Sequence, residues 1–421
     1  MNNQAARPPV APIKPQLDRS DVRVTHAAGI GGMISEFIGR VRSGDLGSLP
    51  VVVGLIIIWT VFTSLNPIFL SPNNLVNLLF DCSTVGVISL GIVCVLMLGE
   101  IDLSVGSMSG VGSALIGLLW VNKGVPLPIA IVLAIVLGAA VGAIYALLRT
   151  RLGMPSFVST LSGLLALLGL QLYLLGSTGS INLPYGSDMV NFGQLLIMPG
   201  WVSYSLALLP GIATLVMGVR TRAQRQAANL SSGSIGGVMA RAALLSVGLE
   251  AIIFYLNQGR GVPWMFGLFV LLVVIMNYAF TRTQWGRSMM AVGGNAEAAR
   301  RSGINVKRIY LSAFITCSML AAVGGVLSAA RLASASQQAG TGDVNLNAIA
   351  AAVIGGTSLF GGRGSSWSAL LGIIVIQSIA NGLTLLSLSS SLRYMITGGV
   401  LAIAVIVDSL ARQSRVSHGR A

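Results

Sequence analysis

Gly99-Glu-Ile-Asp-Leu-Ser-Val-Gly106 carries two carboxylates, Glu100 and Asp102, between long apolar stretches. Residues 75–98 contain one charged side chain, and residues 103–121 contain none. A carboxylate near the centre of a bilayer costs roughly 2.5–3.5 kcal/mol on insertion scales. We therefore expect this stretch to interrupt the membrane-spanning helices and to face protein or a water-filled path, not lipid.

The composition of the whole chain is that of a membrane protein. Of its 421 residues, 54% are hydrophobic and only 9% are charged, with a mean hydropathy of +0.82, whereas soluble domains average about 25% charged residues. Apolar runs long enough to cross a bilayer lie near 50–70, 75–99, 103–121, 125–148, 156–176, 201–219, 242–257, 262–281, 309–330, 347–360, 366–387 and 394–411. The run at 347–360 is short and rich in glycine. We predict an all-α polytopic membrane protein with 10–12 transmembrane helices, some of them broken or re-entrant.

The net charge of +14 follows from the predicted topology. If the runs cross alternately from a cytoplasmic N-terminus, 22 of the 26 Lys and Arg residues fall on the cytoplasmic side and 4 on the other. This bias is the positive-inside rule, and it places both termini in the cytoplasm. The basic charge therefore does not indicate a nucleic-acid partner.

Three regions are predicted along the chain. Residues 1–48 are polar, contain several prolines and lack a signal-peptide core, which is typical of a disordered cytoplasmic tail. Residues 49–411 form the transmembrane domain, and residues 412–421 form a short cytoplasmic tail. Between two apolar runs, the basic and Ser/Gly-rich loop 220–241 is interpreted as a flexible connector.

Catalytic and metal-binding chemistry have little support in the sequence. The three cysteines lie in apolar runs and are interpreted as small buried residues; they are Cys82, Cys94 and Cys317. Both histidines lie in the polar tails. We therefore predict no metal site, no cofactor and no catalytic residue.

A loop between two apolar runs predicts a short cytoplasmic helix at 295–303. Asn295 suits the N-cap, Glu297 lies in the first turn, and Arg300 and Arg301 lie in the last turn, where each charge suits the helix dipole. Gly303 suits the left-handed position after the helix. Two interpretations stay open, a docking point for a partner protein and an ordinary solvated surface helix.

An ATP-hydrolysing site is not predicted on this chain. Its three lysines, Lys14, Lys123 and Lys307, lie outside any Gly-x-x-x-x-Gly-Lys-Ser/Thr motif, which is the phosphate-binding P-loop. If transport is driven by ATP, the ATPase is a separate polypeptide.

Four motifs in order resemble the monosaccharide (ribose, xylose, arabinose, galactose) permeases of bacterial ABC importers. They are Gly99–Ser107, Pro155–Ser162, Gly294–Asn305 and Ala351–Gly362, and the likeness covers roughly residues 50–410. The loop and helix pair around 220–263, which ends Arg260-Gly-Val-Pro263, look most like the xylose-transport branch.

The resemblance implies a bacterial inner-membrane permease that takes up a monosaccharide, with D-xylose or a related pentose expected. It further implies a homodimer with a pore along its axis, a periplasmic sugar-binding protein and a cytoplasmic ATP-binding subunit. The helix at 295–303 then corresponds to the segment that docks the ATPase.

Candidate path residues are Glu100, Asp102 and Ser104, whose oxygens suit hydrogen bonds to sugar hydroxyls, and Asn381 in a later apolar run. For Asp102 a structural alternative stays open, in which its carboxylate caps a helix that starts at Leu103. Irregular backbone is expected at the glycines of the two predicted breaks, which are Gly99, Gly106, Gly355, Gly356, Gly361 and Gly362.

The chain also departs from the family pattern. Asn345-Leu-Asn347 stands where the family commonly has Glu-Leu-Asp, so any ion pair made there is in doubt. Asp81 and Glu250 are single charges within apolar runs, and each either serves transport or pairs with another helix.

A rival function is a secondary transporter that couples solute to protons through Glu100, Asp102 or Glu250. An intramembrane enzyme is disfavoured because the apolar runs lack histidine.

Overall fold

The computed structural model describes residues 49–399, apart from 229 and 231–233, together with 402 and 406. The chain divides into two compact parts, one formed by residues 204–252 of the helices α8 and α9 and the other by the remaining described residues. The predicted tails at 1–48 and 412–421 lie outside the described residues.

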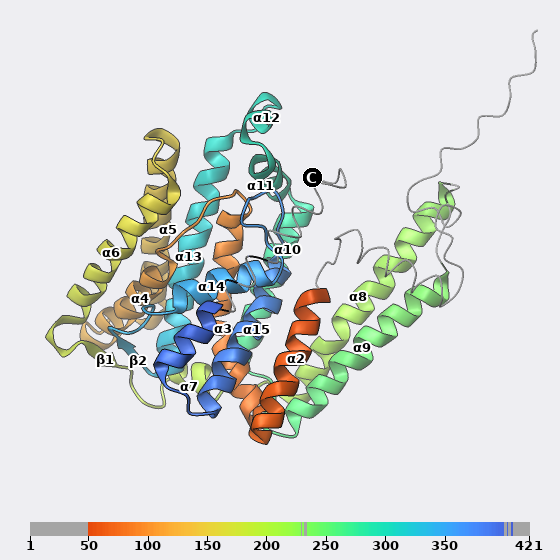
Figure 1. The fold of residues 1–421 in the computed structure, drawn as a ribbon, viewed down its shortest axis with the longest axis horizontal. Coiled ribbons are helices and arrows are strands. Elements are labelled where there is room, and N and C mark those ends of the chain that lie inside the picture. Colours follow the sequence, from red (N-terminus) through yellow and green to blue (C-terminus); the bar gives the residue numbers. More distant parts are fainter. Residues whose placement is uncertain (1–48, 229, 231–233, 400–401, 403–405, 407–421) are drawn as a thin grey trace, which may run out of the picture. The chain divides into compact units, whose positions relative to one another are not determined.

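The larger part is built almost entirely of helices (Figure 1). Its elements are α2 (Leu49–Leu65), η1 (Pro67–Leu70), α3 (Pro72–Leu96), α4 (Val105–Ile116), η2 (Gly117–Asn122), α5 (Leu127–Arg151), α6 (Ser156–Leu175), η3 (Gly176–Thr178), β1 (Ser180–Asn182), α7 (Asp188–Gln194), α10 (Trp264–Arg282), α11 (Gln284–Gly294), α12 (Ala296–Arg301), α13 (Val306–Leu332), β2 (Ser334–Ser336), α14 (Val344–Ile354) and α15 (Ser366–Leu385).

Among the described residues, nine helices are long and apolar enough to cross a membrane, and Val51–Leu65 and Val344–Ile354 are shorter apolar helices. This confirms the all-α polytopic class and the predicted short run after residue 347. Most of the predicted run at 394–411 lies outside the described residues. One small departure is a two-stranded antiparallel ribbon, in which β1 pairs with β2 and Ile181 lies opposite Ala335.

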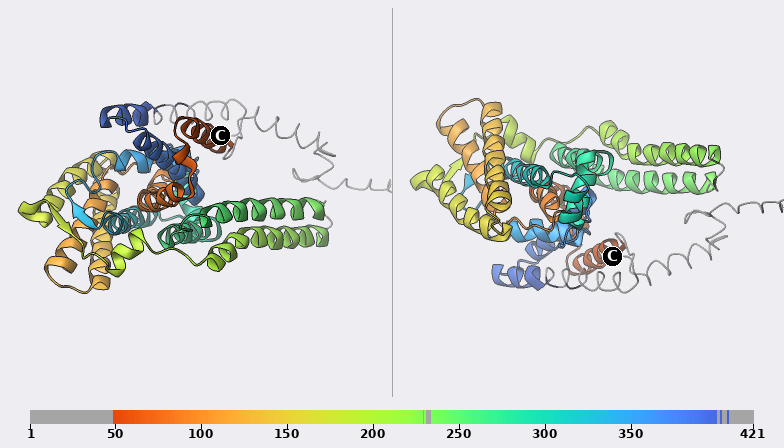
Figure 2. Two further views of the ribbon diagram at one scale, coloured as in Figure 1. Left: turned by 90° about the horizontal axis from the view of Figure 1, so that it is seen from below. Right: turned by 90° about the horizontal axis from the view of Figure 1, so that it is seen from above.

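Helices α3 and α13 form the centre of the larger part, whose helices are seen roughly end-on in Figure 2. In their most apolar windows, 78% and 72% of the residues are buried, compared with 22% in α5. Helix α13 packs against α3, α4 and α5. A membrane helix buried on all sides cannot face lipid, so α3 and α13 position the segments attached to them.

Close packing around α13 depends on glycine. A Cβ atom added at Gly142 of α5 would overlap the backbone carbonyl of Phe314 in α13, and one added at Gly325 of α13 would overlap the carbonyl of Ser109 in α4. Small residues allow membrane helices to approach until their backbones touch, which gains van der Waals contact that lipid cannot replace. The many glycines of this chain therefore serve helix packing as well as helix breaks.

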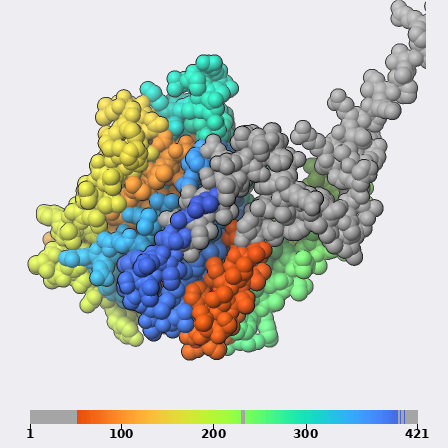
Figure 3. All heavy atoms as spheres, in the orientation of Figure 1, coloured from red at the N-terminus to blue at the C-terminus, as the bar shows by residue number. Residues whose placement is uncertain are grey.

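The two ends of the larger part differ. Helices α11 and α12 lie at one end, and the β1–β2 ribbon and α7 lie at the other (Figure 1). On one face, α15 runs beside α2, where the indole N–H of Trp59 donates to Ser378 Oγ at 2.9 Å. Blue α15 and red α2 are side by side on the face drawn in Figure 3.

The second part is a hairpin of α8 (Gly200–Ala227) and α9 (Ile235–Asn257). Gly211 packs against Ser246 and Gly218 against Val238, so the two helices run antiparallel. In their most apolar windows only 17% and 6% of the residues are buried. An apolar surface of this extent suits lipid and not water.

Replacing Gly142 by Ala tests the packing of α5 against α13. The added methyl meets backbone, which cannot rotate away, and we expect a loss of about 1–3 kcal/mol in the free energy of unfolding. Thermal unfolding of the detergent-purified protein measures it. Gly169→Ala is the matched control, since an added Cβ there has nothing within 4 Å. Equal melting temperatures for the two variants would contradict this packing.

Candidate functional site

Glycine at position 99 ends α3. Gly99 has a φ of 74°, its N–H donates to the carbonyl of Leu96 at 2.8 Å, and the N–H of Glu100 donates to the carbonyl of Val95 at 3.1 Å. This is the Schellman arrangement, in which a left-handed glycine satisfies the last carbonyls of a helix. The predicted break is therefore real. The break lies beside α11, because a Cβ atom added at Gly293 would overlap Met97 O.

Both carboxylates of the break are sheltered by protein, as expected. Glu100 is 8% exposed and Asp102 is fully buried. Glu100 Oε1 accepts a hydrogen bond from Arg149 Nε at 2.7 Å, which joins the break to the last turn of α5. The guanidinium of Arg149 also lies over the ring of Tyr310, 5.5 Å from its centroid. The charge of Glu100 is thus neutralised by an ion pair between segments 49 positions apart.

Asp102 forms a local turn just before α4, whose N-cap residue is Ser104. Its Oδ1 accepts hydrogen bonds from the backbone N–H of Ser104 at 2.8 Å and from Ser104 Oγ at 2.7 Å, while Cys317 Sγ lies 3.8 Å from Oδ2. The predicted helix start was wrong by two residues, since α4 begins at Val105 and not at Leu103, and Asp102 bonds the residue before the helix instead of an N–H inside it. The reason is that the aspartate bonds the second N–H after it, so the helix starts later.

The second motif, Pro155–Ser162, lies directly beside this break. Ser156 Oγ accepts a hydrogen bond from the N–H of Ile101 at 3.4 Å. Thr160 Oγ1 accepts one from the N–H of Leu103 at 3.1 Å. Backbone groups that leave a helix in a membrane need such partners. The hydroxyls of α6 therefore support the irregular backbone between α3 and α4.

Residues 355–365 form a second break, between α14 and α15. Gly356, Gly361 and Gly362 have φ values of 107°, 82° and 75°, which other residues rarely adopt. Gly355 and Gly106 do not have positive φ, and their role is close approach: an added Cβ would overlap Ser368 O at Gly355 and would lie 2.5 Å from Gly340 O at Gly106. The N–H of Gly362 donates to Met97 O at 2.9 Å, so the two breaks touch.

The short helix α12 forms as its sequence predicts. Asn295 Oδ1 accepts a hydrogen bond from the N–H of Ala298 at 2.9 Å, and Gly303 has a φ of 86°. Glu297 pairs with Arg301 at 3.3 Å and with Arg300 at 3.5 Å. All three charged side chains are more than half exposed. The helix therefore presents a rigid, charged and solvent-accessible surface at its end of the bundle.

Asn381, a predicted path residue, lies away from the first break. Its side chain exchanges two hydrogen bonds with Asn74 of α3, at 2.8 and 3.1 Å. Asn74 also donates to the carbonyl of Phe69 at 2.7 Å. In this conformation the amide of Asn381 holds α15 against α3, and the structure brings together only Glu100, Asp102 and Ser104 of the predicted path.

A further polar cluster was missed by the sequence analysis as a group. Asp81 of α3 pairs with Arg331 at the end of α13, with Nε 2.9 Å from Oδ1. Asn77, one helical turn earlier, accepts from Arg260 at 2.6 Å. Both guanidinium groups lie over the ring of Phe80, at 5.0 and 5.9 Å from its centroid. The sequence could have indicated this cluster, because Asn74, Asn77 and Asp81 are spaced three and four residues apart and so share one face of a helix.

The structure also gives the hydrogen-bond partners or burial of the other residues that the sequence analysis named. These are Asn345, Asn347, Glu250 and the three cysteines. Asn345 Oδ1 accepts a hydrogen bond from the N–H of Gly106, so this amide caps α4 inside the protein. Asn347 is 7% exposed, and its Oδ1 has no hydrogen-bond partner among the described residues. The same holds for Oε1 of Glu250 in the hairpin part. All three cysteines are buried and free, which confirms their interpretation as small core residues.

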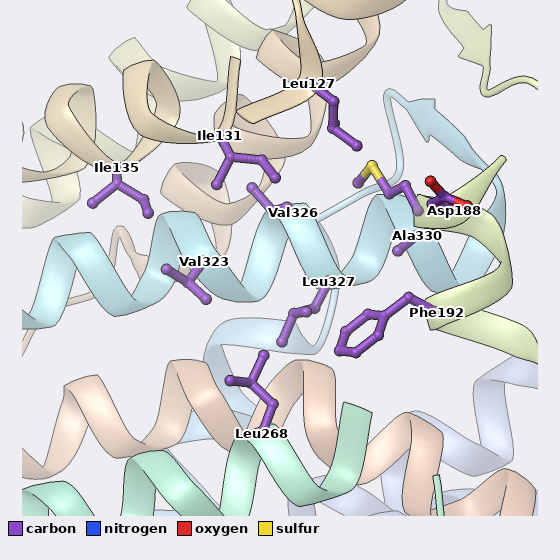
Figure 4. A pocket seen from close by; sticks show the side chains of 11 residues that line it. Leu127, Ile131, Ile135, Asp188, Phe192, Leu268, Val323, Val326, Leu327 and Ala330 are labelled. Atoms are coloured by element: carbon purple, nitrogen blue, oxygen red, sulfur yellow. The ribbon is translucent and has the colours of Figure 1, made fainter. Parts of the chain in front are cut away.

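A cavity of about 320 Å³ beside α13 is unsuited to a sugar (Figure 4). Among the described residues that line it, only Asp188 is charged, and the rest are apolar; they are Leu127, Ile131, Ile135, Met189, Phe192, Leu268, Val323, Val326, Leu327 and Ala330. A sugar needs several hydrogen-bond partners around its hydroxyls. The polar clusters described above lie elsewhere, at the two breaks and around Asp81.

Comparison with known proteins identifies the family of this chain. Residues 74–405 match the model of the branched-chain amino acid transport system/permease component family. The chain belongs to this family. It is a multi-pass membrane protein, and the resemblance to bacterial permeases is confirmed.

Individual relatives cover nearly the whole chain. The xylose transport system permease protein XylH of Escherichia coli (strain K12) is 36% identical over 374 residues, which is 88% of this chain and 94% of that protein. XylH of Haemophilus influenzae is 34% identical over 377 residues, 88% and 98% of the two chains. The ribose import permease protein RbsC of Escherichia coli (strain K12) is 30% identical over 362 residues, 85% and 92% of the two chains. No solved structure matches.

Asp81→Asn and Arg331→Gln, singly and together, test the pairing of α3 with α13. Since the two groups form one ion pair, their effects on the free energy of unfolding should be non-additive by roughly 0.5–3 kcal/mol. The measurement is a double-mutant cycle in detergent. Glu297→Gln with Arg301→Gln is the control cycle, whose exposed pair should couple by only about 0.3–0.5 kcal/mol. Strict additivity at Asp81 and Arg331 would argue against their pairing.

Proposed function

We propose that the chain is the permease subunit of an ATP-driven importer and forms the translocation path for a monosaccharide, D-xylose or a related pentose. The observation that carries the proposal is the similarity to the two XylH proteins along almost the full length of each chain. The more distant likeness to RbsC supports a monosaccharide more broadly. The substrate enters as a free sugar and leaves unchanged, so the chain performs no covalent chemistry.

The charge distribution supports a cytoplasmic location for α11 and α12. Arg300 and Arg301 lie in α12 at this end. At the end that carries the β1–β2 ribbon and α7, Arg331 lies in the last turn of α13, just before β2, and Arg260 donates to the carbonyl of Gln194 in α7. By the positive-inside rule, the end with α12 is cytoplasmic in a bacterial inner membrane. The opposite end then faces a periplasmic sugar-binding protein, and α12 meets a separate ATP-binding subunit.

The proposed path runs past the first break. Glu100, Asp102 and Ser104 supply oxygens suited to sugar hydroxyls, but Asp102 and Ser104 are 0% and 1% exposed. In this conformation the path is therefore closed at the break, and the sugar passes only when residues 99–104 move. Asn381, bonded to Asn74, is proposed to line the path when α3 and α15 separate.

The mechanism proposed for this permease is alternating access. Closure of the ATP-binding subunits of a homodimeric permease displaces α12, and the segments joined to α12 open or close the cytoplasmic side. Loose contacts with sugar suit a path, because tight binding would slow release. Most of the selectivity then rests with the binding protein.

Reconstitution in vesicles tests the function. The permease, its ATP-binding subunit and its binding protein, co-reconstituted, are expected to accumulate labelled D-xylose only when ATP is present. Ribose and an amino acid such as leucine serve as comparison substrates. Uptake that follows a proton gradient and needs no ATP-binding subunit would replace this proposal by a secondary transporter.

Asp102→Asn tests the path at the first break. Hydrogen bonds to a charged group contribute roughly 1.5–3 kcal/mol and those between neutral groups about 0.5–1.5 kcal/mol. Removing the charge while keeping an acceptor oxygen is therefore expected to lower D-xylose uptake about tenfold, while membrane insertion is retained. Asp188→Asn is the control, since that carboxylate is exposed on α7. Normal uptake by a well-inserted Asp102→Asn protein would remove Asp102 from the mechanism.

A further inference from the structure

Helix α11 touches both breaks through a single glycine. A Cβ atom added at Gly293 would overlap the carbonyl oxygen of Met97, before the first break, and would lie 2.6 Å from the backbone N of Gly362, in the second. Both neighbours are backbone, so neither can yield by a side-chain rotation. The end of α11 thus lies against the two irregular segments at once.

The three segments also hold one another. The N–H of Gly362 donates to Met97 O at 2.9 Å, which ties the second break to the first. A Cβ at Gly361 would lie 2.7 Å from Gly293 O and 2.8 Å from Gly99 N. We name this meeting point of residues 97–99, Gly293 and residues 361–362 the glycine junction. Backbone here packs against backbone, and a close-packed contact transmits displacement instead of absorbing it.

The junction is rigidly joined to α12. Asn295 ends α11, with its N–H bonded to Ala291 O at 3.0 Å, and begins α12, with its side chain accepting from Ala298 at 2.9 Å. Its carbonyl also accepts from the N–H of Ala299 at 2.9 Å, and Ala299 is 4% exposed. One residue therefore separates the α12 helix from Gly294, and no flexible linker lies between them.

We propose that the glycine junction transmits the movement of α12 to both breaks together, and that Gly293 is the positioning residue on which this transmission depends. The inference rests on the proposed function and adds the mechanical link between ATP-driven motion and the path. When α12 is displaced, α11 carries Gly293 with it, and the backbones at Met97 and Gly362 must follow. The segment that bears Glu100 and Asp102 then moves with the second break and not independently of it.

Gly293→Ala tests the junction in the reconstituted complex of permease, ATP-binding subunit and binding protein. The variant is expected to lower ATP-dependent D-xylose uptake about tenfold, while it still assembles with the ATP-binding subunit and hydrolyses ATP. The number of ATP molecules spent per sugar therefore rises, which a merely unstable permease would not show, because loss of folded protein lowers both rates alike.

Gly294→Ala is the matched control. It makes the same change one residue later, and an added Cβ there has nothing within 4 Å; its uptake should stay within about twofold of the parent. Unchanged uptake and an unchanged ATP-to-sugar ratio in Gly293→Ala would overturn the junction while leaving the proposed function intact. Absence of ATP-dependent uptake by the unsubstituted protein would instead overturn the proposed function.

A second measurement covers the case in which Gly293→Ala fails to fold. Hydrogen exchange of the unsubstituted complex is compared with and without a non-hydrolysable ATP analogue. Protection at residues 97–104 and 355–365 should change together with that at 293–301. A change confined to 293–301 would show that α12 moves without the breaks, and the proposal would fall.

Discussion

In a membrane, backbone that leaves a helix needs a polar partner, and the rest of this structure depends on how that constraint is met at two places. After α3 the chain turns at Gly99, and after α14 it turns through Gly356, Gly361 and Gly362. Each turn leaves N–H and C=O groups outside a helical ladder. They are satisfied by the hydroxyls of α6, by the carboxylate of Asp102 and by the bond between Gly362 and Met97. The breaks thus stabilise each other.

The carboxylates of the first break have different tasks that follow from their partners. Glu100 is neutralised by Arg149 and holds the break to α5. Asp102 is fully buried and accepts hydrogen bonds from the backbone N–H and the hydroxyl of Ser104, the residue before α4. Both roles are structural in this conformation. The carboxylate oxygens also lie on residues 99–104, the segment that would open in the proposed transport. A structural role and a transport role are therefore compatible.

Polar contacts at the opposite end follow the same physical rule. Asp81 lies within the apolar helix α3, where an unpaired charge is costly, and Arg331 meets it from the end of α13. Asn74 and Asn381 satisfy each other between α3 and α15. Because α3 takes part in every one of these contacts and in the first break, it connects the polar groups of both ends. A displacement of α3 along its axis would therefore move the polar groups at both ends together.

Local signals in the sequence determined the helices, the break at Gly99 and the capped helix α12, since apolar run length, glycine and capping residues act within a few positions. The pairing of Asp81 with Arg331 spans 250 positions and that of Glu100 with Arg149 spans 49, and neither has a local signature. The junction of Met97, Gly293 and Gly362 likewise appears only when three distant segments meet. Tertiary structure decided these contacts, because they depend on which helices pack together and at what depth, and a sequence pattern records only the neighbours along the chain.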